Sequence, residues 1–227
     1  MPINIKKIEK IINYHFTDSS LLQRAFTHSS YANEQNCVSN ERMEFLGDAV
    51  LQIIVSDYIF SKSDKDEGVL SKIRSNAVSS DSLSKITLSL GLEKYLLLGE
   101  SQKRNMNNLH FKTYANLYEA VLCAIYIDGG LDKAKDFVLS TLKEVLKEGL
   151  NGNFYDSPKT ELQEYCQKYK IILRYKLVGK SGPDHNPQFI YAVLLDDKVY
   201  GEGMGQSKLT AQTEAAVKAL EVIYKRS

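Results

Sequence analysis

The sequence predicts an all-α domain followed by a small α+β domain, and three observations support this. Apolar residues recur at spacings of three and four over the first 150 residues, which is the period of an amphipathic helix. No proline occurs between Pro2 and Pro158, so nothing interrupts helices in that part of the chain. After about residue 151 the apolar residues alternate instead, which is the period of a strand.

The helical part shows its period in runs such as Ile5, Ile8, Ile11 and Ile12, or Leu46, Val50 and Ile54, or Phe45, Ala49 and Ile53. Gly47 and Asp48 interrupt an otherwise good helical pattern, because both residue types are unfavourable inside a helix. Residues of this kind in such a place indicate close packing or a functional role. We therefore expect residues 1–150 to form one domain with an important helix around Gly47.

The second domain is expected over residues 157–227, after a linker at 151–156 that begins with Asn151-Gly152. Its order is a helix, three antiparallel strands and a second helix. The first helix has Ser157 as N-cap, Pro158 in its first turn and its end near Lys168. The expected strands are 171–178, 189–195 and 198–203, with a turn at Asp196-Asp197, and Ser207 caps a last helix over 208–224.

Composition excludes several classes of protein. The net charge is +1, from −1 in residues 1–150 (18 basic, 19 acidic) and +2 in the rest (11 basic, 9 acidic), so the chain is not a polycation. The longest apolar run, 120–127, is too short for a membrane span, and the first ten residues lack the apolar core of a signal peptide. Cys37, Cys123 and Cys166 are scattered, which argues against a disulfide framework or a zinc site. We expect a cytoplasmic protein with no membrane partner, and Cys123 in the core.

A group of carboxylates is the first candidate site. Glu41, Glu44 and Asp48 are spaced i, i+3 and i+7, so a helix places them on one face. The remaining positions, Phe45 and Ala49 among them, are mostly apolar, and the helix is therefore expected to be buried apart from this acidic stripe. Two interpretations remain open from spacing alone: a solvated acidic surface, or oxygen ligands for a magnesium ion.

Two further acidic elements follow. Asn116 and Glu119 are spaced i, i+3 in an apolar stretch, where a buried Glu119 needs a partner, and a metal shared with Glu44 and Asp48 would supply one. Asp66-Glu67-Gly68 stands at the expected start of another helix and could be no more than an acidic helix start.

The run Glu41-Arg42-Met43-Glu44-Phe45-Leu46-Gly47-Asp48-Ala49-Val50 resembles the signature of the ribonuclease III family. The resemblance covers almost the whole chain. It continues in 27–31, which looks like the family's early helix, in 67–74, and in 119–128, which looks like its last acidic helix. The second domain resembles the double-stranded-RNA-binding domain that follows the nuclease domain in bacterial members.

The resemblance implies an endoribonuclease that cuts double-stranded RNA as a homodimer, one strand per subunit, leaving 5′-phosphate and 3′-hydroxyl ends. Substrates would be ribosomal RNA precursors and messenger RNA. Mg²⁺, for which Mn²⁺ could substitute, would be held by Glu44, Asp48, Asn116 and Glu119, of which Asp48 and Glu119 are the expected catalytic residues. Glu41 and Glu67 would be accessory acidic residues. Phe45 would insert into the partner subunit, the alternative being core packing within its own subunit.

The second domain carries the expected RNA contacts. A double-stranded-RNA binder needs polar side chains at the minor groove and cations at phosphates. Thr160, Gln163 and Glu164 share one face of its first helix, and His185 lies in the turn between the first two strands. Ser207 and Lys208 stand at the N-terminus of the last helix, where backbone N–H groups favour a phosphate.

The chain also departs from the family. Asn116 stands where the family usually has Asp, so an amide oxygen replaces a charged ligand and weaker metal binding is expected. Asn116 is compatible with a working variant, with an engineered substitution that slows cutting, or with a protein that only binds RNA. Two further departures are the asparagine-rich segment 101–112, expected to be a loop near the RNA, and the single Lys208 where relatives often carry several basic residues.

Overall fold

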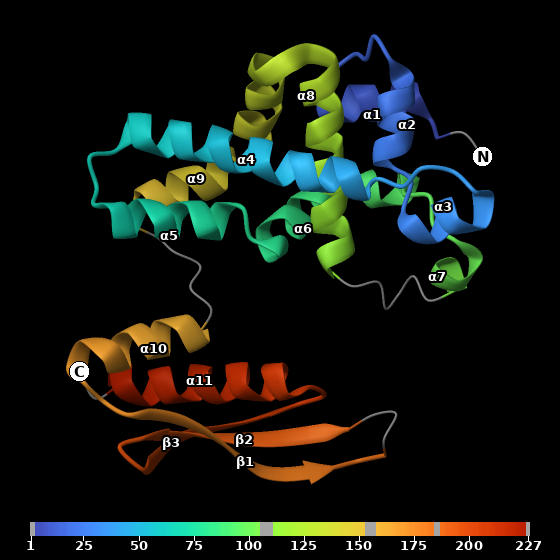
Figure 1. Cartoon of the computed structure of the whole chain (residues 1–227). Coiled ribbons are helices and arrows are strands. Elements are labelled where there is room, and N and C mark those ends of the chain that lie inside the picture. The colour runs from blue at the N-terminus through green and yellow to red at the C-terminus, as the bar shows by residue number, and fades with distance from the viewer. Residues whose placement is uncertain (1–2, 105–110, 153–157, 184–186, 226–227) are drawn as a thin grey trace. The chain divides into compact units, whose positions relative to one another are not determined.

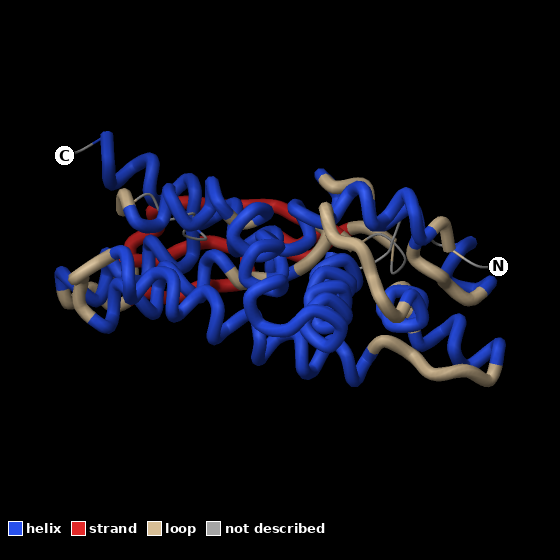
Figure 2. Tube along the Cα trace, turned by 90° about the horizontal axis from the view of Figure 1, so that it is seen from above, coloured by secondary structure: helices blue, strands red, loops and turns tan. Residues whose placement is uncertain are grey.

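The computed structural model describes residues 3–104, 111–152, 158–183 and 187–225. The chain divides into two compact units, Met1–Phe154 and Tyr155–Ser227 (Figure 1). In the described residues all three strands belong to the second unit, and helices make up most of the rest (Figure 2). The expected linker at 151–156 overlaps residues outside the described ranges, so its boundaries stay a prediction.

The first unit is helical, as predicted. Its elements are α1 (Ile5–Ile12), α2 (Ser19–Ala25), α3 (Ser29–Gln35), α4 (Glu41–Lys62), α5 (Glu67–Ala77), α6 (Ser80–Ser89), the 3₁₀ helix η1 (Leu92–Tyr95), α7 (Glu100–Arg104), α8 (Phe111–Thr141) and α9 (Lys143–Leu150). A kink divides α8 at Gly130, whose φ of 78° only glycine adopts readily. The expected early helix at 27–31 begins later, at Ser29, because His28 caps it by accepting the N–H of Ser30.

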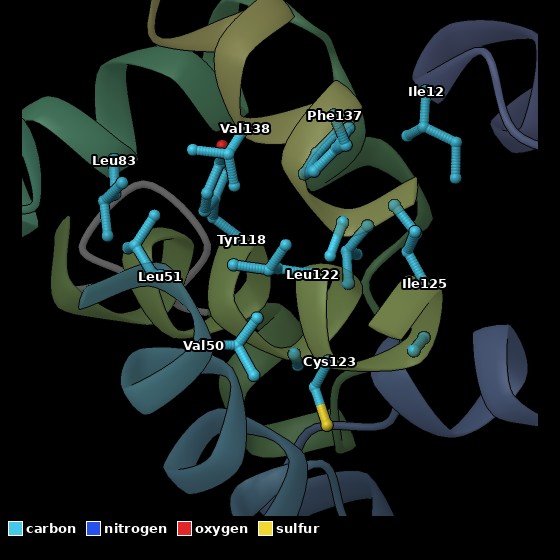
Figure 3. Packing of buried hydrophobic residues seen from close by; sticks show 14 of the residues in the cluster. Ile12, Val50, Leu51, Leu83, Tyr118, Leu122, Cys123, Ile125, Phe137 and Val138 are labelled. Atoms are coloured by element: carbon cyan, nitrogen blue, oxygen red, sulfur yellow. The ribbon is translucent and has the colours of Figure 1, made fainter. Parts of the chain in front are cut away.

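The first half of α8 is the centre of this unit. From Leu117 to Ile125 every residue but Glu119 is at most 1% exposed, because α4, α6 and α2 cover this segment from different sides. Figure 3 shows Val50 and Leu51 of α4 and Leu83 of α6 gathered around Tyr118, Leu122 and Cys123. The prediction that Cys123 belongs to the core is confirmed. A helix buried all round in this way has a fixed place in the fold, and it is this helix that carries Asn116 and Glu119.

The second unit has the predicted order: α10 (Pro158–Tyr169), β1 (Leu173–Ser181), β2 (Gln188–Leu195), β3 (Lys198–Gly205) and α11 (Lys208–Lys225). The strands form an antiparallel sheet in the order β1-β2-β3, and α11 packs on β2, β3 and α10 (Figure 1). Gly201 and Gly203 lie directly beneath α11: a Cβ at Gly203 would be 2.2 Å from the backbone N of Ala215. Glycine is required there because the strand and the helix approach backbone to backbone.

Two local details of the sheet refine the expectations. The turn at Asp196-Asp197 is present, and both residues have positive φ (45° and 65°), as in the tight hairpin turns that suit twisted strands. In β1 the expected alternation ends at Leu177, which is 45% exposed, because the pairing with β2 shifts between Leu177 and Gly179. A bulge of this kind turns the following side chains to the other face.

Within the described residues, none of the helices combines the length and the apolar character that crossing a membrane would require.

Candidate metal and RNA sites

The first candidate site lies where α4 crosses α8 at Gly47. A Cβ at this position would be 1.9 Å from the carbonyl oxygen of Glu119, so the two helix backbones are in direct contact there. The glycine that weakens the helix locally is thus explained by packing. Since Glu44 and Asp48 flank Gly47 by one turn or less, the contact brings these two carboxylates to Asn116 and Glu119.

The electrostatics indicate that the carboxylates of Glu44, Asp48 and Glu119 influence one another. Burial, followed by the charges of Asp48 and Glu44, raises the pKa of Glu119 from 4.5 to about 8. Burial likewise raises the pKa of Glu44, and the charges of Glu41 and Asp48 add to the effect. Three carboxylates from two helices, with Glu44 and Glu119 half-buried and Asp48 exposed, therefore repel one another, and a cation would relieve the repulsion.

Asn116 takes part as a hydrogen-bond partner of Glu44, and this contact lowers the pKa of Glu44. The bond favours the ionised carboxylate, so the Asn116 amide N–H donates to it. An Asp in the same place would instead add a fourth negative charge. Asn116 thus connects α8 to α4 while leaving its amide oxygen available as a neutral ligand.

Lys112 is a residue that the sequence reasoning missed. Its positive charge lowers the pKa of both Glu44 and Glu119. It precedes Asn116 by four residues and Glu119 by seven, which places all three on one face of α8. That spacing was visible in the sequence and could have identified Lys112 as a neighbour of the acidic group.

The outer carboxylates are more exposed. Asp48 accepts a hydrogen bond from Gln52 Nε2 at 3.3 Å, and Glu41 accepts one from Ser39 Oγ at 3.1 Å. Glu67 is the first residue of α5 and accepts from Ser71 Oγ at 2.8 Å. None of the charges that shift the pKa of Glu44 or Glu119 belongs to Glu67, so the structure does not bring it into the acidic group.

The fit of this group to a metal can be judged from its donors. Glu44, Asp48, Asn116 and Glu119 offer only carboxylate and amide oxygens, the hard ligands that Mg²⁺ prefers, and no sulfur or imidazole. Among the described residues, no three His, Cys, Asp or Glu side chains are close enough together to form a finished ligand cage. The donor chemistry and charge suit Mg²⁺, and water molecules would complete its coordination, as is usual for this ion.

A second feature of α4 is an exposed apolar stripe. Phe45 is 82% exposed, Phe60 78% and Ile53 57%, and Ala49 is exposed as well. The expectation that α4 is buried apart from its acidic stripe is therefore wrong. So is the alternative that Phe45 packs in the core of its own subunit. The helix has a third face, apolar and open, because its other sides are already occupied by α8 and the acidic residues.

A pocket of about 620 Å³ lies beside this stripe, between α4 and α5. Its apolar lining includes Ile53, Phe60 and Leu70. Polar and charged residues form the rest, among them Glu67 and Arg74, whose guanidinium donates to Ser56 Oγ at 3.1 Å. When two copies of a chain associate, the exposed aromatic ring of one copy can pack into the apolar pocket of the other.

The candidate RNA contacts lie on the second unit. Thr160, Gln163 and Glu164 are exposed on α10, as expected from their spacing. Lys159 lies beside them, and its Nζ donates to Gln212 Oε1 at 2.7 Å, which ties α10 to α11. His185 falls outside the described residues.

At the start of α11 the predicted cap is present in reciprocal form. Ser207 Oγ accepts the N–H of Thr210 at 3.1 Å, and Thr210 Oγ1 accepts the N–H of Ser207 at 3.0 Å. The Ser207 hydroxyl is thus used by the helix, while the N–H groups of Lys208 and Leu209 make none of the helix's internal bonds. Lys208 is exposed, so the N-terminus of α11 offers a cation and backbone donors to an anion.

Comparisons with known proteins agree with this arrangement. A family described as "Ribonuclease-III-like" matches residues 18–146, and a "Double-stranded RNA binding motif" matches residues 158–223. The chain is 40% identical over 226 residues to "Ribonuclease 3" of a Nitratiruptor species, covering 98% of each chain. It is also 40% identical over 217 residues to "Ribonuclease 3" of Caldanaerobacter subterraneus subsp. tengcongensis, covering 94% of this chain and 95% of the relative.

Among solved structures, the nuclease domain of ribonuclease III from Campylobacter jejuni superposes with a TM-score of 0.58 at 36% identity, covering 62% of this chain and 97% of that domain. The structure is described by its flexibility in a region involved in dimer formation.

Proposed function

We propose that this chain, which belongs to the ribonuclease III family and is by that membership a double-stranded-RNA endoribonuclease, cuts its substrate with the help of Mg²⁺. The ion would be held by Glu44, Asp48, Asn116 and Glu119. The observation that supports the proposal is the backbone contact at Gly47, because it brings α4 and α8 together at the positions of these carboxylate and amide oxygens. The same contact explains a glycine that helix propensity alone disfavours.

The chemistry follows from the donors. Bound Mg²⁺ would supply an activated water and relief of charge on the phosphate, which phosphodiester hydrolysis requires; Mn²⁺ could substitute. Asp48 and Glu119 would orient the attacking water, since a carboxylate oxygen accepts hydrogen bonds from the O–H groups of water. Asn116 would hold Glu44 in place through its amide. The products would carry 5′-phosphate and 3′-hydroxyl ends.

The two strands of a duplex require two sites, and we propose a homodimer with one acidic group per subunit. Phe45 of each copy would enter the pocket lined by Ile53, Phe60 and Leu70 of the other. This removes the exposed aromatic ring from water and fills the pocket in one step. Glu41 and Glu67 would act as accessory residues at this dimer interface, where they could contact water, RNA or the partner subunit.

The second unit would hold the duplex. Thr160, Gln163, Glu164 and His185 are proposed for the minor groove, and Ser207 and Lys208 for a phosphate. Processing of ribosomal and messenger RNA in the cytoplasm is the role that we propose.

Lys208→Ala should weaken binding to every duplex sequence by a similar factor and lower the salt slope, d log K/d log[salt], by about 1 unit, since one phosphate contact releases about one counterion. The measurement is duplex affinity against salt concentration. Lys198→Ala, an exposed lysine at the far end of the sheet, is the control and should leave the slope unchanged. Equal slopes for both variants and the parent would remove Lys208 from the RNA contacts.

The function itself is tested by incubating the chain with a labelled perfect RNA duplex, with and without Mg²⁺, beside Asn116→Asp. Cutting that requires Mg²⁺ is expected for both. The Asp form should need less Mg²⁺ for half-maximal cutting, by about tenfold, because ligand charge sets affinity. If neither cuts, the catalytic assignment is wrong.

The same assay tests a binding-only protein, an interpretation that 40% identity to a "Ribonuclease 3" over nearly the full chain does not favour. If only Asn116→Asp cuts while both forms bind the duplex, the site assignment survives, but the present chain is a disabled form.

A further inference from the structure

Two buried hydroxyls on α6 contact the start of α8. Ser84 and Thr87 are both 0% exposed and lie three residues apart, on the same face of α6. Ser84 Oγ donates to the carbonyl oxygen of Phe111, and Thr87 Oγ1 lies 2.9 Å from that of Tyr114. Each acceptor is 27 residues after its donor in the sequence, so a spacing of three residues along α6 corresponds to the same spacing along α8.

These bonds are more specific than the apolar packing around them. Leu83 of α6 is fully buried in the same contact, but apolar burial is not directional and tolerates a small slide or rotation of a helix. A hydrogen bond requires both a distance and an angle. Two of them, one turn apart, fix the rotation of α8 about its axis as well as its position along it.

The segment that they fix is the one that carries the site. Phe111 and Tyr114 lie in the first turn of α8, and Asn116 and Glu119 follow in the next two turns. On its other side the same segment lies against Gly47 of α4, through the Glu119 carbonyl. The start of α8 is thus held between two hydroxyls on α6 and a backbone contact on α4.

We propose that Ser84 and Thr87 are positioning residues for the cleavage reaction: they set the rotation of α8 at which Asn116 and Glu119 meet Glu44 and Asp48. Both are fully buried, and neither belongs to the proposed metal ligands or RNA contacts. Thr87 Oγ1 also lies 2.9 Å from Leu83 O in its own helix, so its single proton can be drawn to either carbonyl. Without the α8 bonds, the side chains of Asn116 and Glu119 would turn away from α4. This inference rests on the proposed function of the acidic group.

The test compares Thr87→Val, which keeps the shape and removes the hydroxyl, with Thr87→Ser, which keeps the hydroxyl. Thr87→Val combined with Ser84→Ala should lower kcat by about tenfold, because a small misplacement of reacting groups is costly. It should also raise the Mg²⁺ needed for half-maximal cutting. The KM for duplex RNA should not change, since the second unit is untouched, and Thr87→Ser should retain the parent's values.

Val138→Ala is the matched control, because it opens a cavity in the same core, beyond the kink in α8, and removes no hydrogen-bonding group. It should lower the melting temperature without changing kcat or the Mg²⁺ requirement. The proposal is overturned if the double variant keeps the parent's kcat and Mg²⁺ requirement, or if Val138→Ala changes them as much. Should the double variant not fold, Thr87→Val against Thr87→Ser decides in the same way.

A second measurement separates this inference from the proposed function. The rise in melting temperature with added Mg²⁺ reports metal binding without RNA or cutting. The double variant should need more Mg²⁺ for the same rise. If the parent shows the rise but does not cut, the proposed activity fails, and the placement of Asn116 and Glu119 by Ser84 and Thr87 is judged from the Mg²⁺ dependence of the melting temperature alone. An equal rise at equal Mg²⁺ in parent and double variant contradicts the positioning role.

Discussion

Glu119→Gln should abolish cutting while leaving duplex binding intact. The substitution keeps the size and one carbonyl oxygen but removes the charge that a cation and an attacking water require. We expect kcat to fall by about a thousandfold, which corresponds to about 4 kcal/mol of activation free energy. Duplex affinity and its salt slope should not change, because the proposed RNA contacts lie on the second unit.

Glu144→Gln is the matched control for this experiment. Glu144 is an exposed glutamate on α9, far along the chain from the acidic group, and the same change of charge there should leave kcat at the parent's value. Measuring single-turnover cutting with saturating enzyme separates the chemical step from binding. If Glu119→Gln cuts as fast as Glu144→Gln, Glu119 does not belong to the catalytic group.

The same variant should change how stability depends on pH in the absence of Mg²⁺. The pKa of Glu119 is raised from 4.5 to about 8, so between these values the folded chain keeps a proton that the unfolded chain has released. Stability of the parent should therefore fall as the pH rises through this window, by up to about 1.4 kcal/mol per pH unit from this group. Glu119→Gln should flatten the slope and melt at a higher temperature near pH 8. Identical slopes would show that Glu119 is ionised in the folded protein.

The sequence predicted the fold well where one physical cause acts locally. The order of the second unit follows from alternation in its strands and from the turn at Asp196-Asp197, and the cap at Ser207 follows from its residue type. The helices of the first unit follow from their period. Both kinds of pattern record which side of a segment is buried, and that is decided within a few residues.

The candidate site was predictable in part. Spacing placed Glu44 and Asp48 on one face and Asn116 and Glu119 on another helix, but only the contact at Gly47 shows that the two faces meet. Spacing could not show that α4 has an open apolar face, because Phe45 and Ile53 have the same period as a core residue such as Leu51. Nor could it show the roles of Ser84 and Thr87, since a hydroxyl buried against another helix looks like any polar surface position.

Phe45→Ala should dissociate the proposed homodimer while the fold of each chain stays intact. Because Phe45 is 82% exposed, its ring packs little against its own subunit, and its removal costs that subunit almost nothing. Loss of an aromatic side chain from a buried interface typically costs about 3 kcal/mol of binding free energy, which raises the Kd of the dimer by more than about a hundredfold. Sedimentation equilibrium measures this Kd. Leu131→Ala, at a side chain 47% exposed beyond the kink in α8, is the control and should leave it unchanged.

A mixing experiment tests whether the proposed interface is formed by Phe45 of one chain in the pocket of the other. Ile53→Lys places a charge in the pocket at a position 57% exposed, so the chain should fold and yet not accept Phe45 of a partner. In a symmetric dimer each copy contributes one ring and one pocket. In a mixture of the two variants, the Ile53→Lys chain keeps its Phe45 ring and the Phe45→Ala chain keeps its pocket. One of the two ring-in-pocket contacts can therefore form. The mixture should associate more tightly than either variant alone. Equal association in all three samples, or a Phe45→Ala chain that dimerises like Leu131→Ala, would mean that the ring and the pocket do not meet.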